Sequence, residues 1–130
     1  MSRDRQYLDM MNQWLILKQE GKSIAEYLTA KGYRAVAVYG MALYGRHVIR
    51  ELEGTNISII CGIDRREIKP YKGIKVIQPL AGLPDADVII NTAIRDHDLI
   101  KAALKEMTDI PVLCLEDIIF DCYDQEKASV

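Results

Sequence analysis

The fold of this chain is indicated most clearly by Ala35-Val36-Ala37-Val38-Tyr39-Gly40-Met41-Ala42-Leu43-Tyr44-Gly45-Arg46. An apolar run ends at Gly40, and small residues follow at fixed spacing, at Ala42 and Gly45. The spacing fits the dinucleotide-binding pattern G-x-G-x-x-G, with alanine in the middle place. There the first small residue permits a turn off a strand, the second lets the backbone approach a diphosphate, and the third lets a helix pack on the sheet. The stretch therefore predicts a strand, a tight turn and a helix whose N-terminus holds phosphates.

Composition places the chain among ordinary globular domains. Its 130 residues suit one domain, and 49% are apolar and 28% charged. The net charge of -2 argues against a nucleic-acid or anionic-membrane partner. The absence of a transmembrane-length apolar run and of a signal-peptide core predicts a cytoplasmic location. The three cysteines lack paired metal spacing, so reduced core thiols and no metal site are expected at Cys61, Cys114 and Cys122.

Helical and strand patterns alternate along the chain. Helices are expected at 3–20, 23–32, 43–52, 96–107 and 118–120, and strands at 35–39, 57–63, 74–77, 86–92 and 111–115. Within these helices Leu43 is expected to face the core, and Asp96 to cap its helix. The alternation predicts a single three-layer α/β domain of Rossmann type, with a parallel sheet in the order 3-2-1-4-5.

Three parts of the chain are expected to differ in organisation. Residues 1–32 form an N-terminal helical arm, 33–123 a Rossmann-type nucleotide-binding domain, and 124–130 a polar tail that frays. The arm includes a capping box at Ser23-Ile24-Ala25-Glu26. Its first helix is amphipathic and either packs on its own chain or provides an interaction arm for a homodimer or protein partner, through Met10, Met11 and Trp14.

An acidic residue follows the second strand at the place where such residues accept hydrogen bonds from an adenosine ribose. Asp64 lies 19 residues after Gly45. Arg65 and Arg66 come next and either pair with a 2′-phosphate or lie in a solvated loop. Because Asp64 would repel a 2′-phosphate, NAD is favoured over NADP.

Residues at the end of the fourth strand complete the predicted cofactor site. Asn91, Thr92 and Ala93 either line a diphosphate or ribose or simply end the strand. Tyr44 either lies over a base or ribose or has a packing role. The full predicted site comprises Gly40, Met41, Ala42, Leu43, Tyr44, Gly45, Asp64, Arg65, Arg66, Asn91, Thr92 and Ala93.

Several common catalytic patterns are missing from the sequence. There is no Walker sequence, no H-E-x-x-H and no G-x-S-x-G. No activated nucleophile is recognisable beside a base. His47 and His97 have no partner spacing and are interpreted as surface residues. The sequence therefore predicts a binding module rather than an enzyme that acts on its own.

Five runs of the sequence have a familiar pattern: Gly21-Lys22-Ser23-Ile24-Ala25-Glu26-Tyr27-Leu28, Val38-Tyr39-Gly40-Met41-Ala42, Gly62-Ile63-Asp64, Gly73-Ile74-Lys75-Val76 and Asp87-Val88-Ile89-Ile90. Together they resemble small Rossmann domains of bacterial surface-polysaccharide gene sets. Such domains are similar to the N-terminal part of nucleotide-sugar dehydratase or epimerase-like proteins. The resemblance implies a nucleotide-binding accessory or regulatory function in nucleotide-sugar and polysaccharide metabolism.

Three hypotheses remain open from the sequence. The chain is a module that binds NAD(H) or a related nucleotide and acts on a partner or as a sensor. Alternatively, it is a subunit of an oxidoreductase or epimerase for nucleotide sugars, with the active site completed by another chain. The third hypothesis is a degenerate Rossmann domain that mediates interactions without a ligand.

Overall fold

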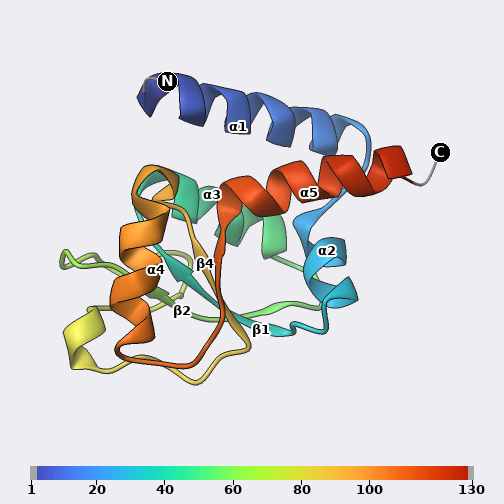
Figure 1. The fold of residues 1–130 in the computed structure, drawn as a ribbon. Coiled ribbons are helices and arrows are strands. Elements are labelled where there is room, and N and C mark those ends of the chain that lie inside the picture. Colours follow the sequence, from blue (N-terminus) through green and yellow to red (C-terminus); the bar gives the residue numbers. More distant parts are fainter. Residues whose placement is uncertain (1–2, 129–130) are drawn as a thin grey trace.

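The computed structural model describes the backbone of residues 3–128 and the side chains of residues 4–122. Five strands form one parallel sheet in the order β3-β2-β1-β4-β5 (Figure 1). The strand order therefore reverses beside β1, which confirms the predicted α/β architecture. The strands are β1 (Ala35–Tyr39), β2 (Ser58–Ile63), β3 (Val76–Ile77), β4 (Val88–Asn91) and β5 (Val112–Cys114).

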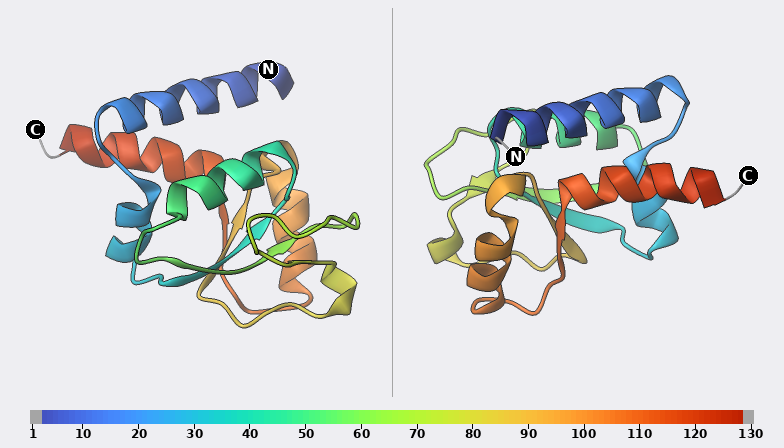
Figure 2. Two further views of the ribbon diagram at one scale, coloured as in Figure 1. Left: turned by 180° about the vertical axis from the view of Figure 1, so that it is seen from behind. Right: turned by 45° about the horizontal axis from the view of Figure 1, so that its top comes forward.

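Helices cover both faces of the sheet in unequal numbers. Four of them share one hydrophobic cluster on one face, and α4 packs on the other face (Figures 1 and 2). On the crowded face α1 forms an outer layer that runs along α5. The helices are α1 (Arg3–Gln19), α2 (Ile24–Ala30), α3 (Leu43–Leu52), α4 (His97–Lys105) and α5 (Leu115–Ala128), with 3₁₀ turns η1 (Pro79–Ala81) and η2 (Ile94–Asp96).

The continuous apolar run of β1 follows from helices on both sides of the sheet. Val36 and Val38 face the cluster of α1, α2, α3 and α5, whereas Ala37 and Tyr39 face the cluster that includes Leu104 of α4. Successive strand side chains point to opposite faces, so a strand covered on both faces needs apolar residues at every position. The central strand is buried for this reason.

The helix that follows β1 has the predicted bounds but a different buried face. Its core positions are Gly45, Val48, Ile49 and Leu52, whereas Leu43 is 58% exposed. At 100° per residue, Leu43 lies roughly 120° or more around the helix from Val48, Ile49 and Leu52. The expectation that Leu43 faces the core is therefore wrong.

The start of α4 also differs from the prediction. The Asp96 side chain makes no cap hydrogen bond, and a 3₁₀ turn precedes the helix. The backbone of Asp96 has a ψ of 24°, whereas a capping residue is usually extended. By contrast, Ser23 caps α2 as expected, because its Oγ accepts a hydrogen bond from the backbone N–H of Glu26 at 3.2 Å.

The C-terminal helix is much longer than predicted. It begins at Leu115 and continues to Ala128, so most of the expected polar tail is helical, while Ser129 and Val130 lie outside the described residues. Ile118, Ile119 and Cys122 are buried at helical spacing, and α1 packs along this helix. These tertiary contacts stabilise a helix that the sequence window alone does not indicate.

The N-terminal arm belongs to the core of its own chain. Met10, Trp14 and Leu17 are buried in the same cluster as α2, α3 and α5. The described part of the arm therefore packs with the rest of the domain in one hydrophobic cluster. Met10 and Trp14 are buried within the chain, which favours the packing alternative for these two side chains, whereas Met11 is half-buried.

Glu51 of α3 connects the arm to the rest of the domain. Its side chain is 5% exposed and accepts hydrogen bonds from Trp14 Nε1 at 2.6 Å and from the backbone N–H of Ile24 at 2.8 Å. Lys18 Nζ lies 3.6 Å from the same carboxylate. One buried anion thus joins α1, the start of α2 and α3.

Candidate functional site

The turn after β1 needs glycine at both of its ends. Gly40 has a φ of +87°, and a Cβ there would lie 2.5 Å from Thr92 Oγ1. A Cβ at Gly45 would overlap the carbonyl oxygen of Gly40. Ala42 instead has a negative φ of -81°, outside the left-handed region that favours glycine, and it is exposed. The first and third small residues therefore serve close packing, and the middle one presents a methyl group to the cleft described below.

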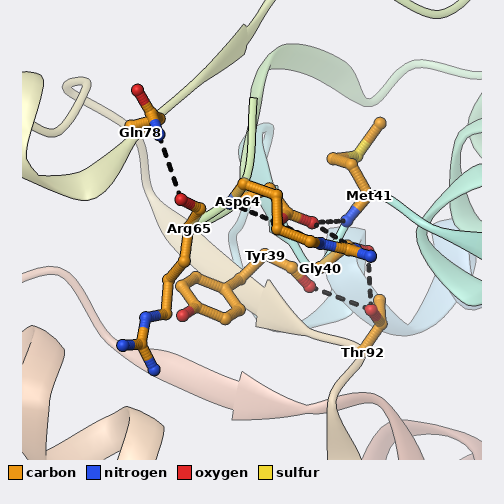
Figure 3. Close-up of polar contacts among 8 residues, drawn as sticks. Tyr39, Gly40, Met41, Asp64, Arg65, Gln78 and Thr92 are labelled. Carbon is orange, nitrogen blue, oxygen red and sulfur yellow. Dashed lines mark hydrogen bonds and ion pairs between the residues drawn. The ribbon is translucent and has the colours of Figure 1, made fainter. Parts of the chain in front are cut away.

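Thr92 holds this turn from the end of β4. Its Oγ1 lies 2.9 Å from the carbonyl oxygen of Tyr39 and 2.7 Å from that of Gly40 (Figure 3). Its backbone N–H also donates to the Tyr39 carbonyl at 2.9 Å. The hydroxyl group is thus committed to the backbone of the turn, and this explains why no Cβ fits at Gly40.

Asp64 holds the same turn from the end of β2. Its Oδ2 accepts the backbone N–H of Met41 at 2.9 Å, and its Oδ1 accepts the backbone N–H of Arg66 at 2.9 Å (Figure 3). The Arg66 side chain donates to both oxygens, from Nε at 3.0 Å and from Nη2 at 3.1 Å. A carboxylate accepts about four hydrogen bonds. All of the acceptor sites of Asp64 that were predicted to bind a ribose are therefore occupied by donors of the chain itself.

The charge of Asp64 is favoured by these contacts. Burial alone would raise the pKa of this carboxyl group, but hydrogen bonds from the Arg66 side chain and from the backbone N–H groups of Arg66 and Met41 outweigh burial. The pKa of Asp64 is consequently below its ordinary value. Asp64 is an anion at neutral pH and carries its own counter-ion in Arg66.

A cleft of about 700 Å³ opens at the carboxyl ends of β1 and β4. Its floor is the glycine turn and the end of β4, and the first turns of α1 form one wall. This is the position where open α/β sheets bind ligands. The lining residues are Asp4, Tyr7, Leu8, Met11, Gly40, Ala42, Leu43, Tyr44, Arg66, Thr92 and Ala93.

The wall contributed by α1 is absent from the predicted site. Tyr7 stacks on Tyr44 with ring centroids 4.5 Å apart and an interplanar angle of 15°. Tyr7 Oη lies 3.5 Å from the carbonyl oxygen of Thr92. One face of the Tyr44 ring is therefore already covered by Tyr7. No local pattern links Tyr7 to a turn 33 residues further along the chain, so sequence reasoning had no signal for this contact.

The start of α3 points into the cleft. Ala42 is its capping residue and offers no side-chain hydrogen bond to the first turn. The first backbone N–H groups of a helix have no partner within the helix, and the helix dipole adds partial positive charge there. Leu43 and Tyr44, which open the helix, both line the cleft. The chemistry of this end suits an anion.

Other predicted site residues shape the turn without lining the cleft. The Met41 side chain is fully buried and packs where a Cβ of Gly62 would lie, and its N–H is bound by Asp64. Gly45 lies beneath the Gly40 carbonyl. The Arg65 carbonyl accepts a hydrogen bond from Gln78 at 3.0 Å. The Arg65 side chain lies beside the Tyr39 ring, away from the turn (Figure 3).

Asn91 is fully buried and orients a histidine instead of lining the cleft. Its Oδ1 accepts the Ala93 N–H at 2.9 Å, which fixes the orientation of the amide. Its Nδ2 then lies 3.0 Å from Nδ1 of His97. Because the amide nitrogen of Asn91 can only donate, Nδ1 of His97 accepts this hydrogen bond. The ring hydrogen of neutral His97 is therefore on Nε2. The half-buried His97 is thus a positioned side chain, although the sequence predicted an ordinary surface residue.

A smaller cleft of about 350 Å³ adjoins His97, between η2 and the start of α5. Its lining mixes Arg95 with acidic side chains such as Asp98, Glu116 and Asp117. Among the residues that the structure describes, no group of three or more His, Cys, Asp or Glu side chains could hold a metal ion. No helix within residues 3–128 is long and apolar enough to cross a membrane.

Comparison of the chain with protein-family models and with curated proteins found no match.

Proposed function

We propose that this chain binds a nucleotide, with NAD(H) as the first candidate, and that the diphosphate lies at the start of α3. One observation carries the proposal: a helix N-terminus without a side-chain cap opens into a cleft of about 700 Å³ where the strand order reverses. Backbone N–H groups and the dipole favour an anion at such an end. The volume is in the range of small-molecule sites, about 300–1,000 Å³.

The cleft residues divide into groups for phosphate and for the rest of the ligand. The backbone at Ala42, Leu43 and Tyr44 would face the diphosphate, and Arg66 would supply a positive charge at the edge of the cleft. The stacked Tyr7 and Tyr44 rings both line the cleft and would offer aromatic surface to a base or ribose. A ribose that bonds to Asp64 would have to displace the Arg66 side chain, which is largely exposed.

An accessory or regulatory role in nucleotide-sugar or polysaccharide metabolism is the wider form of the same proposal. The resemblance of the sequence to small Rossmann domains of such gene sets supports it. The sequence has no Walker, H-E-x-x-H or G-x-S-x-G pattern and no recognisable nucleophile beside a base, which favours a binding role over turnover by this chain alone.

Calorimetric titration with NAD⁺, NADH, NADP⁺, coenzyme A and UDP-glucose tests the proposal directly. We expect the tightest binding for NAD⁺ or NADH, with competition by inorganic pyrophosphate. Ala42→Asp places a carboxylate at the phosphate position, where negative charge suits the helix dipole, so it should retain stability and lose at least about 10-fold in affinity.

Ala42→Gly is the matched control. It removes the methyl group that faces the cleft, and we expect affinity equal to or higher than that of the wild type. If none of the five ligands binds at millimolar concentration, or if Ala42→Asp binds as well as the wild type, the proposal fails.

A second candidate function is a Rossmann-type interaction domain without a nucleotide ligand. The occupied carboxylate of Asp64 favours it, because the usual ribose acceptor is engaged by Arg66 and Met41. This function predicts no nucleotide binding in the same titration, together with unchanged stability when nucleotides are added.

A further inference from the structure

The side of α1 that borders the cleft and the α1–α3 groove presents an apolar stripe that the chain itself does not cover. Leu8 is 63% exposed and Leu15 is 56% exposed, and the half-buried Met11 lies between them. Residues 8, 11 and 15 have the i, i+3, i+7 spacing of one helix face. The helix already buries Met10, Trp14 and Leu17 on a different face, so this stripe is additional to its contact with the core.

Opposite charges end the stripe. Asp4 lies one turn before Leu8, and Lys18 lies one turn after Leu15. Both are exposed, and the Lys18 side chain reaches solvent although its Nζ lies 3.6 Å from Glu51. At 1.5 Å per residue the stripe from Asp4 to Lys18 is about 21 Å long.

Two copies of this stripe match each other when the two helices run antiparallel. Next to an antiparallel second copy, Asp4 faces Lys18, Leu8 faces Leu15, and Met11 faces Met11. A parallel second copy would instead place Asp4 against Asp4 and Lys18 against Lys18. Two-fold interfaces use one patch on both subunits and require this self-complementarity.

We propose that the chain forms a two-fold homodimer in which α1 packs antiparallel on α1 of a second copy, with the axis at Met11. The proposal does not depend on nucleotide binding.

A groove of about 320 Å³ beside the stripe supports the same pairing. It lies between α1 and α3, and its lining comprises Met11, Trp14, Leu15, Lys18, His47, Arg50 and Glu51. In the antiparallel arrangement Asp4 of the second copy arrives beside Lys18, which lies 3.6 Å from Glu51 within its own chain. Opposite charges at the rim of an interface set orientation and exclude the wrong arrangement.

The dimer also bears on the nucleotide cleft. Leu8 and Met11 line that cleft together with Leu43, which is exposed on α3. Leu15 of the second copy would pack against Leu8 and add apolar surface at the cleft wall. Four to five helical turns form a small interface compared with the roughly 800 Å² per partner of stable complexes. We therefore expect a reversible dimer with a dissociation constant on the order of 10 µM.

Sedimentation velocity over a concentration series of about 1–500 µM tests the dimer. The wild type should pass from monomer to dimer across this series. Leu15→Glu should weaken the dimer at least about 10-fold, because it places two carboxylates in the apolar stripe. Leu80→Glu is the matched control, since Leu80 is 96% exposed on η1, and it should leave the dimer unchanged.

Charge reversal tests the antiparallel register. Asp4→Lys and Lys18→Glu should each weaken the dimer about 3–5-fold, because each places like charges opposite one another. The double variant should recover the wild-type affinity. The double variant and Lys18→Glu both lose the lysine beside Glu51. A recovered dimer affinity in the double variant therefore reports the charge pairing between the two copies. Thermal unfolding of each variant checks that the monomer remains folded.

Three results would overturn the proposal: a wild type that stays monomeric throughout the series, a dimer unaffected by Leu15→Glu, or a double variant without recovery. If the wild type is monomeric, the stripe would instead be a contact surface for a different protein. Nucleotide titration of the monomeric Leu15→Glu variant tests the two proposals separately. This variant keeps the glycine turn, so its nucleotide binding does not depend on whether the dimer forms.

Discussion

At the scale of single residues, Asp64 and Arg66 decide how the cleft treats a nucleotide. Arg66 neutralises Asp64 through two side-chain hydrogen bonds and lines the cleft. Arg66→Ala would leave the Asp64 carboxylate without its counter-ion and would remove a cation that could meet a 2′-phosphate. We expect the affinity for NAD⁺ relative to NADP⁺ to rise at least about 10-fold, measured by calorimetry. An unchanged ratio would place the ribose away from Asp64.

The same carboxylate should contribute to stability in a pH-dependent manner. Asp64→Asn replaces an acceptor of backbone N–H groups by an amide that cannot satisfy all of them, so we expect a loss of about 2 kcal/mol in the free energy of unfolding at pH 7. Because the folded-state pKa of Asp64 is lowered, its contribution is present above the unfolded pKa of about 3.9 and is lost as the pH falls through the folded-state value.

Urea unfolding of the wild type and Asp64→Asn at several pH values measures this difference. The gap between the two proteins should narrow below about pH 4. Asp109→Asn, at an exposed position, is the control and should change little at any pH. A gap that is constant from neutral to acid pH would contradict an ionised Asp64.

The three cysteines are expected to be unreactive thiols in the folded protein. All are free and buried, and burial raises the pKa of Cys61 and raises the pKa of Cys114 and of Cys122 to about 11. The thiolate is the reactive form, so little of it exists near neutral pH. A disulfide-exchange reagent should modify no thiol quickly in the native protein and three in urea. Rapid modification of one native thiol would contradict the burial of that residue.

At the scale of elements, Glu51 determines how α1 and α2 attach to α3. Glu51→Ala would leave the indole N–H of Trp14 and the backbone N–H of Ile24 without their acceptor. An unsatisfied buried donor costs about 1–3 kcal/mol, so we expect a loss of about 3 kcal/mol in the free energy of unfolding. Glu53→Ala removes only an exposed pair with Lys72 and should cost about 0.5 kcal/mol or less. Equal losses in the two variants would argue against the buried junction.

Helix ends show where local sequence was sufficient. Ser23 was correctly predicted as a cap because a hydroxyl group three residues before Glu26 acts within one turn. The side-chain cap predicted at Asp96 is wrong, because the chain enters α4 through a 3₁₀ turn whose geometry depends on the end of β4. The length of α5 was also missed, since α1 and α2 supply the contacts that stabilise it.

At the scale of the whole molecule, α1 is part of the fold. Removal of residues 1–20 would expose the partners of Met10, Trp14 and Leu17, which are all buried. Each such side chain contributes about 1.5–3 kcal/mol, and the total is comparable to the 5–15 kcal/mol that stabilises an ordinary domain. We expect this truncated chain to be unfolded or aggregated, measured by circular dichroism and size-exclusion chromatography. A cooperative thermal transition near that of the full chain would show that the arm is dispensable.

Local sequence patterns were sufficient to predict the parallel sheet, its strand order and the glycine turn. These follow from short-range rules: apolar runs of strand length, crossovers of fixed hand, and the spacing of Gly40 and Gly45 directly after an apolar run. No such pattern predicts that Arg66 occupies the carboxylate of Asp64 or that Tyr7 forms a wall of the cleft; both are seen in the folded chain. The physical reason is that both depend on which side chains meet once the chain is folded. Tyr7 is remote in sequence from the turn, and Asp64 offers acceptors that a neighbouring guanidinium can take as readily as a ribose.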